Sequence, residues 1–259
     1  MAKSAGMRRS ATFVSAFARG LQLIATFGPN AQRMTVAEAA ARAGFDRAVT
    51  RRLLLTLVDL GYATTDGKQF ELTSQVLRLG FSYLAAMGLD VRLQPHLDDL
   101  SRAIQESVSV SMLDGTDVVF VARSDAAGRQ IASSVRIGTR LSAFITASGR
   151  MLLSMQPDEQ VLALLRTANM RAMTRHTIVD RRELLATVQK ARKDGYAVND
   201  QETEEGLLGA AVLLRNRSGR AIASLNANSH IARVKKHQLV RDIVPKMQDC
   251  ANRLSSLLL

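Results

Sequence analysis

Tryptophan is absent from the 259-residue chain, and aromatic residues make up only 4% of it. Any core must therefore be packed from Leu, Ala, Val, Ile and Met. Hydrophobic residues still amount to 47% of the chain, a share that excludes global disorder. The length suits two domains of ordinary size better than one.

Cysteine and long apolar runs are scarce as well. Cys250 is the single cysteine, so no disulfide can form within the chain, and a reducing cytosol suits it. No apolar run approaches the length of a transmembrane helix, and the basic N-terminal residues are not followed by the apolar segment of a signal peptide. We therefore expect a soluble, cytoplasmic protein that does not contact a membrane.

Positive charge, by contrast, is abundant. Lys and Arg number 35 against 23 acidic residues, which gives a formal net charge of +12. Such an excess attracts polyanions. Residues 8–52 hold eight arginines and two acidic residues, but residues 91–259 are also basic, with 24 basic and 17 acidic residues. Charge alone therefore does not locate a nucleic-acid site.

The N-terminal third shows the pattern of a helix-turn-helix. Apolar residues at helical spacing predict helices over 10–27, 36–43 and 47–60. Gly44 is a typical residue just past the end of a helix. A hairpin is predicted next, because Asp66–Gly67 lies between two β-prone runs. Three helices followed by a hairpin indicate a winged helix-turn-helix.

The third helix, which Asp46 can cap, collects arginines in its first turns, where the helix dipole disfavours positive charge. The apolar stripe expected to face inward is Val49, Leu53, Leu57 and Leu60. Polar residues would then project into the major groove, where phosphates or guanine acceptors compensate their charge. The residues predicted to contact double-stranded promoter DNA are Arg47, Thr50, Arg51, Arg52, Lys68 on the hairpin, and Arg19.

Some of these charges have simpler interpretations that stay open. Arginines on an amphipathic helix often form only a solvated face. Lys68 fits a phosphate contact or a hairpin tip kept soluble by its charge. Arg8 and Arg9 fit a minor-groove arm or a frayed terminus.

After a helix over 74–87, strands and helices alternate. Turns such as Asp114–Gly115 join strands that are neighbours along the chain, which favours an antiparallel sheet. The pattern predicts an α+β chain whose second domain is a sensor-like α/β domain. Predicted strands cover 107–124 as a hairpin, 129–137, 196–200, 207–214 and 221–229; predicted helices cover 92–106, 146–155, 157–168, 181–194 and 234–258.

Five segments resemble the IclR family of bacterial transcription regulators. They are FARGLQLIATF (17–27), LGYATTDGKQFELT (60–73), GTRLSAFITASGRMLLS (138–154), GYAVNDQETEEGL (195–207) and ASLNANSHIARV (223–234). The chain looks closest to the subgroup that governs aromatic-acid catabolism, such as the protocatechuate, 4-hydroxybenzoate and β-ketoadipate regulators. Where the family pattern after Gly138 contains proline, this chain has Ser142, which leaves the shape of that loop open.

The resemblance implies a winged helix-turn-helix domain at 1–73, a linker helix at 74–90, and a GAF-like effector-binding and oligomerisation domain at 91–259. It further implies a ligand-responsive transcriptional regulator that acts as a homodimer or homotetramer and needs no cofactor. The implied effector is an aromatic or other small organic acid. A regulator of another carbon-source pathway is the alternative within the family.

The resemblance also implies an effector pocket. Ser148 and the N–H groups beside it, at the start of a predicted helix, suit a carboxylate. Asn226 and Asn228 share one strand face, so they matter only if that face is not solvent. Arg123 is either a further carboxylate partner or half of a surface salt bridge. The implied lining is Leu141, Ala147, Ser148, Asn199, Leu207, Gly209, Asn226 and Asn228.

An enzyme acting on small carboxylic acids is the alternative class. The chain has no G-x-S-x-G or G-x-G-x-x-G pattern, and its four histidines are scattered without cysteines at metal-ligand spacing. The acidic run NDQETEEG (199–206) is interpreted as a polar turn in which Asp200 or Glu202 makes structural hydrogen bonds. A scaffold protein would leave the arginine-rich helix unexplained. We therefore expect a regulator and not an enzyme, with no metal.

Overall fold

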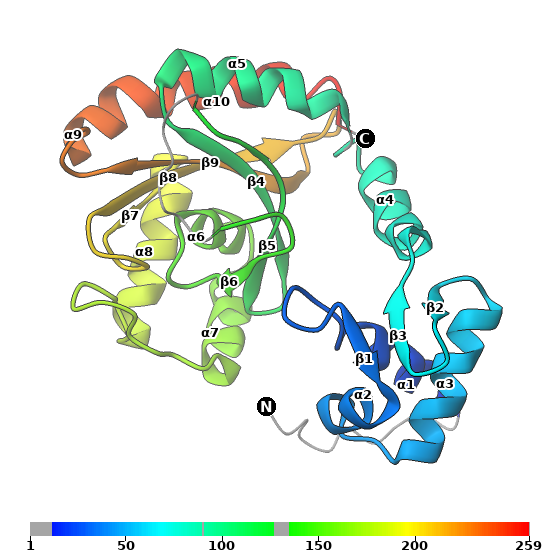
Figure 1. Ribbon diagram of the computed structural model, residues 1–259. Coiled ribbons are helices and arrows are strands. Elements are labelled where there is room, and N and C mark those ends of the chain that lie inside the picture. The colour runs from blue at the N-terminus through cyan, green and yellow to red at the C-terminus, as the bar shows by residue number, and fades with distance from the viewer. Residues whose placement is uncertain (1–11, 90, 127–134, 259) are drawn as a thin grey trace. The chain divides into compact units, whose positions relative to one another are not determined.

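The computed structural model describes residues 12–89, 91–126 and 135–258 (Figure 1). The chain divides into two compact units, Met1–Tyr83 and Leu84–Leu259, and the division falls inside helix α4 (Leu77–Ala86). Within the described residues, no helix has the length and apolar character needed to cross a membrane.

The first unit is a winged helix-turn-helix, as predicted. Helices α1, α2 and α3 pack with an antiparallel sheet whose strand order is β1-β3-β2. The first helix is shorter than the predicted 10–27, because Val14 is extended and residues 1–11 lie outside the described part of the chain. The elements are α1 (Ser15–Ile24), β1 (Arg33–Thr35), α2 (Val36–Ala43), α3 (Arg47–Asp59), β2 (Ala63–Thr65) and β3 (Gln69–Leu72).

Local capping interactions set the turn between α2 and α3. Thr35 and Glu38 form a reciprocal capping box at the start of α2. Gly44 ends α2 with a φ of 71°, a left-handed conformation that glycine adopts without strain. The Asp46 carboxylate then accepts the N–H of Ala48 at 2.7 Å and opens α3.

The inward face of α3 differs from the predicted stripe. Leu54 and Thr50 are fully buried, whereas Val49 and Leu53 are only partly buried and Leu60 is 58% exposed. Leu57 is buried as predicted. Because residues 53–55 are all leucine, the apolar pattern fits two neighbouring phases of the helix, and the prediction of Val49, Leu53 and Leu60 as the rest of the inward stripe is wrong.

The second unit is built on a six-stranded antiparallel sheet with the order β6-β5-β4-β9-β8-β7. Its strands are β4 (Ser107–Asp114), β5 (Asp117–Ser124), β6 (Arg140–Ser142), β7 (Ala197–Asp200), β8 (Leu207–Arg215) and β9 (Ala221–His230). Helices α5 (Gln94–Ile104) and α10 (Val244–Leu254) cover one face (Figure 1). Helices α6 (Ala147–Leu153), α7 (Asp158–Thr167) and α8 (Arg181–Asp194) lie on the other side.

The two central strands, β4 and β9, alternate between apolar and polar residues, yet both of their faces are buried. Val108, Val110 and Leu225 pack in the core beneath α5 and α10. The opposite face carries hydroxyl and amide side chains, and α6 covers it instead of water. Most of these polar side chains are almost fully buried: Ser107, Ser109, Ser111, Ser224 and Asn226.

Two elements of the second unit differ most from their prediction, while several others differ by one or two residues at an end. The terminal helix predicted over 234–258 is broken into α9 (Lys236–Gln238), a π-helical segment at Leu239–Ile243, and α10. Pro245 has no N–H to donate to the preceding turn, so the helix widens there. The predicted strand 129–137 lies largely outside the described residues, and β6 forms further along the chain.

A buried ion pair fixes α6 to the loop after β7. The Arg150 guanidinium binds the Glu202 carboxylate through two contacts, at 2.5 and 2.6 Å, and both side chains are at most 5% exposed. Arg150 also donates to the Phe144 carbonyl, and Glu202 accepts the Ile178 N–H. Glu202 thus makes the structural hydrogen bonds predicted for Asp200 or Glu202 in the core. Asp200 makes weaker contacts: it accepts the Gln201 side-chain amide and pairs with Lys236, each at 3.3 Å.

We predict that Glu202→Gln lowers the free energy of unfolding by about 3–5 kcal/mol, because it leaves the Arg150 charge buried without a counter-charge. Denaturant unfolding of the purified protein measures the change. Glu205→Gln is the matched control: Glu205 pairs with Arg175 at 3.6 Å on the surface, so its loss should cost less than about 1 kcal/mol. Equal costs for the two variants would contradict the prediction.

Candidate functional site

The structure brings all eight residues predicted to line an effector pocket around one small cavity. It lies between α6 and the polar face of the sheet and has a volume of about 30 Å³. The sequence-based prediction missed four further lining residues, Phe120, Val135, Thr146 and Thr203. Phe120 and Val135 belong to the apolar cluster beneath α6, and their positions carried no polar signal.

The start of α6 forms one wall of the cavity. Thr146 caps the helix, and its hydroxyl accepts the Gly149 N–H at 3.1 Å. The Ser148 hydroxyl is buried and has no hydrogen-bond partner among the described residues. Gly149 is required here, because an added Cβ would lie 2.1 Å from the Ala143 carbonyl oxygen. The Ser148 hydroxyl is thus a polar side-chain group on this wall that can bind a ligand.

Asn199 lies on the second wall, where its amide is already engaged. Its NH₂ group donates to the Ile145 carbonyl, and its oxygen accepts the Glu202 N–H at 3.2 Å. Asn199 therefore joins the loop before α6 to the loop after β7. Its hydrogen bonds hold the walls of the cavity together.

The strand β9 supplies the cavity floor. Asn226 lies opposite Ser109 of β4, whose hydroxyl donates to the Asn226 oxygen at 2.5 Å. Asn228 lies opposite Gly209 of β8, and a Cβ on Gly209 would lie only 2.8 Å from the Asn228 Oδ1. The face of β9 that carries the two asparagines is therefore not open to solvent. This is the condition on which their predicted role in an effector pocket depends.

Arg123, at the end of β5, forms the salt bridge that was one of its two predicted roles. Its Nε and Nη2 bind the Asp125 carboxylate at 2.9 and 2.6 Å, and that carboxylate also accepts the Ser107 hydroxyl at 2.8 Å. The hydrogen bond from Arg123 lowers the pKa of Asp125, against the opposing effect of burial. The Arg123 side chain is only 13% exposed, so this is not an ordinary surface pair.

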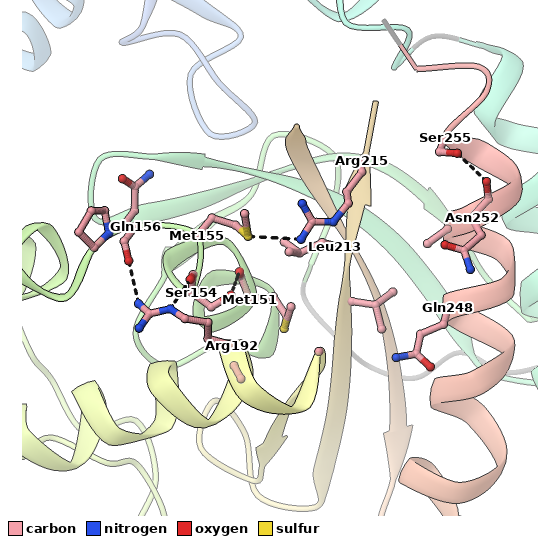
Figure 2. A pocket seen from close by; sticks show the side chains of 15 residues that line it. Met151, Ser154, Met155, Gln156, Arg192, Leu213, Arg215, Gln248, Asn252 and Ser255 are labelled. Atoms are coloured by element: carbon pink, nitrogen blue, oxygen red, sulfur yellow. Dashed lines mark hydrogen bonds between the residues drawn. The ribbon is translucent and has the colours of Figure 1, made fainter. Parts of the chain in front are cut away.

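A larger groove of about 640 Å³ in the same unit contains none of the predicted residues. The groove lies along the C-terminal half of β8, at Val212, Leu213 and Arg215. Helix α10 borders it on one side, and the C-terminal ends of α6 and α8 border it on the other (Figure 2). Arg192 on one wall donates to the carbonyls of Ser154 and Gln156, both at 2.8 Å. Arg215 contacts the Met155 sulfur at 3.6 Å (Figure 2).

In the first unit, most of the residues predicted to contact DNA are exposed. Arg47, Arg51 and Arg52 project from α3, and none of them takes part in the ion pairs formed between described residues. Lys68 and Arg19 are also exposed. Arg8 and Arg9 lie outside the described residues.

The wing is the hairpin formed by β2 and β3. A cluster of charged side chains that was not predicted from the sequence stabilises it. Arg33 on β1 binds Asp66 and Glu71, each at 3.1 Å. The Asp66 carboxylate also accepts the N–H groups of Gln69 and Lys68, which lower its pKa. Arg33 thus stabilises the hairpin, and Lys68 is left exposed at its tip.

Two family models match this arrangement. The helix-turn-helix domain of IclR matches residues 16–67, and the C-terminal domain of the bacterial transcriptional regulator IclR matches residues 81–256. The chain belongs to the IclR family. Its first unit corresponds to the family's DNA-binding domain, and its second to the family's C-terminal domain.

Two transcriptional regulators are similar to this chain over most of their length. The Pca regulon regulatory protein of Pseudomonas putida is 37% identical over 90% of this chain and 80% of its own. The p-hydroxybenzoate hydroxylase transcriptional activator of Acinetobacter baylyi is 34% identical over 96% of this chain and 93% of its own.

Two solved structures are also similar. A transcriptional regulator from Rhodococcus has a TM-score of 0.81 and 40% identity, and the match covers 95% of this chain and 98% of that one. A double mutant of the inducer-binding domain of the PobR transcription factor from Acinetobacter was solved with 3-hydroxybenzoic acid. It has a TM-score of 0.60 and 30% identity, covering 64% of this chain and 96% of that domain.

One predicted DNA contact of this IclR-family helix-turn-helix is wrong. Thr50 is fully buried, and its hydroxyl donates to the Asp46 carbonyl at 2.8 Å. A threonine hydroxyl that bonds its own helix can enter a core, which the polar/apolar pattern did not reveal. Thr50 therefore packs beneath the arginines and cannot reach a groove.

We expect Thr50→Val to change stability by less than about 1 kcal/mol, because the Asp46 carbonyl keeps the Thr50 N–H as a donor at 2.9 Å. Affinity for specific DNA should not change. Thr56→Val is the matched control, since exposed Thr56 makes the same bond to the Arg52 carbonyl. A loss of specific DNA affinity in Thr50→Val at unchanged stability would restore Thr50 as a base contact.

Proposed function

We propose that this chain is a ligand-responsive regulator that binds promoter DNA through α3 and controls an operon for the degradation of aromatic acids. The observation that carries the proposal is the cavity beneath α6, because a buried polar face with an apolar rim suits a small ring that bears polar groups. The relatives named above are transcriptional regulators, so the enzyme alternative has no support from them.

The DNA-binding role rests on the exposed arginines of α3. Arg47, Arg51 and Arg52 lie near the N-terminal end of the helix that follows the turn, the end that faces base edges in a helix-turn-helix. A lone guanidinium near a helix N-terminus is disfavoured by the dipole, and phosphate or guanine acceptors remove that cost. Lys68 at the wing tip would contact the backbone, and Arg19 on α1 would add a phosphate contact.

The effector role rests on the cavity and on the relatives. The walls offer the Ser148 hydroxyl and the asparagine amides, and Leu141 and Leu207 offer apolar contacts. An aromatic acid is far larger than a cavity of about 30 Å³, so its binding must separate α6 from the sheet or rearrange the loop after β7. A ligand that binds a rearranged state shifts the population toward it, which gives the effector a means of control.

Oligomerisation would place two reading helices on one site. Large apolar side chains are exposed on α1 and α4, including Phe17, Leu21, Leu79 and Phe81. Exposed apolar side chains at this density favour association, and we propose a homodimer or a homotetramer in the cytoplasm. Half-sites would then lie about 34 Å apart, or a multiple of that spacing.

For DNA binding, we predict that Arg51→Ala costs about 1–3 kcal/mol on a DNA site selected by the wild-type protein from a randomised pool. Its affinity for random DNA should fall much less. Fluorescence anisotropy at two salt concentrations measures both. The control is Arg102→Ala, because Arg102 is an exposed arginine on α5 paired with Asp99. Equal losses on both DNAs would show that Arg51 contacts only phosphate.

For effector binding, we predict that Asn226→Ala weakens 4-hydroxybenzoate binding by about 1–3 kcal/mol in calorimetry. Asn252→Ala, which alters an asparagine in the larger groove, should bind as the wild type does. Melting temperatures of both variants separate binding from unfolding. If only Asn252→Ala lost affinity for 4-hydroxybenzoate, the effector would bind in the larger groove, which would contradict the proposed site.

A further inference from the structure

Arg123 lies on the same sheet face as the cavity residues. It pairs with Ser109 across β5 and β4, and Ser109 pairs with Asn226 across β4 and β9. Residues directly opposite each other in an antiparallel pair point to the same face. Arg123, Ser109 and Asn226 therefore form one row of side chains on the face of the sheet that carries the cavity.

Arg123 does not line the cavity itself, but the neighbouring rows show that its row crosses the part of the sheet that does. In the row on one side, Phe120 of β5 lies opposite Ser111, and Phe120 lines the cavity. In the row on the other side, Ser107 lies opposite Asn228, which also lines the cavity. The Arg123 row thus runs between two rows that both reach the cavity.

The Arg123 guanidinium is held in place but incompletely bonded. Asp125 occupies its Nε and Nη2, and the Ser107 hydroxyl fixes the Asp125 carboxylate in turn. The Nη1 atom is buried and has no hydrogen-bond partner among the described residues. A buried donor without a partner is costly, and one on a cation is more so. The Asp125 side chain is 56% exposed, so water screens its charge more than that of Arg123.

We infer that the Nη1 group of Arg123 binds the carboxylate of the effector. This inference rests on the proposed function and assigns the acid group to one end of the same site. The ring would lie beneath α6, and the Ser148 hydroxyl, the unpartnered polar group on the α6 wall, would bind a ring substituent at the other end. The site would then select aromatic monocarboxylates and reject their neutral analogues.

This assignment replaces the start of α6 as the carboxylate site. That helix has only seven residues, and Thr146 already caps one of its free N–H groups. A guanidinium carries a full charge and presents its N–H groups in a fixed plane, which suits a carboxylate better.

The test compares 4-hydroxybenzoate with 4-hydroxybenzamide in calorimetry on the full-length protein. The wild type should prefer the acid. Arg123→Gln should weaken acid binding by about 10- to 150-fold, the value of a charged hydrogen bond, and leave amide binding nearly unchanged. Arg215→Gln, at the arginine that lines the larger groove, should keep the wild-type preference. Ser148→Ala should remove the difference between 4-hydroxybenzoate and benzoate.

Three outcomes would contradict the inference. If Arg123→Gln keeps the preference for the acid, Arg123 does not bind the carboxylate, while the proposed function stands. If the preference is lost in Arg215→Gln, the acid binds in the groove. If the wild type binds no aromatic acid, the proposed effector class fails as well. Should Arg123→Gln not fold, Arg123→Lys replaces it, with the same requirement that acid binding weaken more than amide binding.

Discussion

The hydroxyl and amide groups on the α6-facing side of β4 and β9 are removed from water, and each needs a hydrogen-bond partner there. Ser109 meets Asn226 at 2.5 Å, and Ser111 meets Ser224 at 3.1 Å. Because these side chains bond one another, the polar face of β4 and β9 can be buried beneath α6. On α6, opposite this floor, the Ser148 hydroxyl has no hydrogen-bond partner among the described residues, so a polar ligand can supply one. The same constraint thus explains both the packing and the position of the site.

A second set of interactions holds the cover on this floor. The Arg150–Glu202 pair and the two hydrogen bonds of Asn199 join α6, the loop before it and the loop after β7. These segments surround the cavity, so a ligand that enlarges it must move them together. Charged and amide networks of this kind favour discrete arrangements over gradual deformation. A switch between discrete arrangements suits the proposed function, in which effector binding changes DNA binding.

Local signals in the sequence predicted much of the fold. The capping box at Thr35, the Asp46 cap and the Asp66–Gly67 turn act within a few residues, so their outcome did not depend on the rest of the chain. The eight lining residues were found through family resemblance. Contacts made by distant segments were not predictable: Arg150 and Glu202 are 52 residues apart, and burial of Thr50 depends on which leucine phase faces the core. The break before α10 follows from Pro245, which lacks the N–H that the long helix needs there.

Hydrogen–deuterium exchange of the full-length protein with and without 4-hydroxybenzoate tests most directly whether the polar face beneath α6 is the effector site. We expect slower exchange in 143–154 and 199–209, which cover that face, and a further decrease in 224–229 on β9. Protection confined to 191–195 and 248–255, which border the larger groove, would contradict this account.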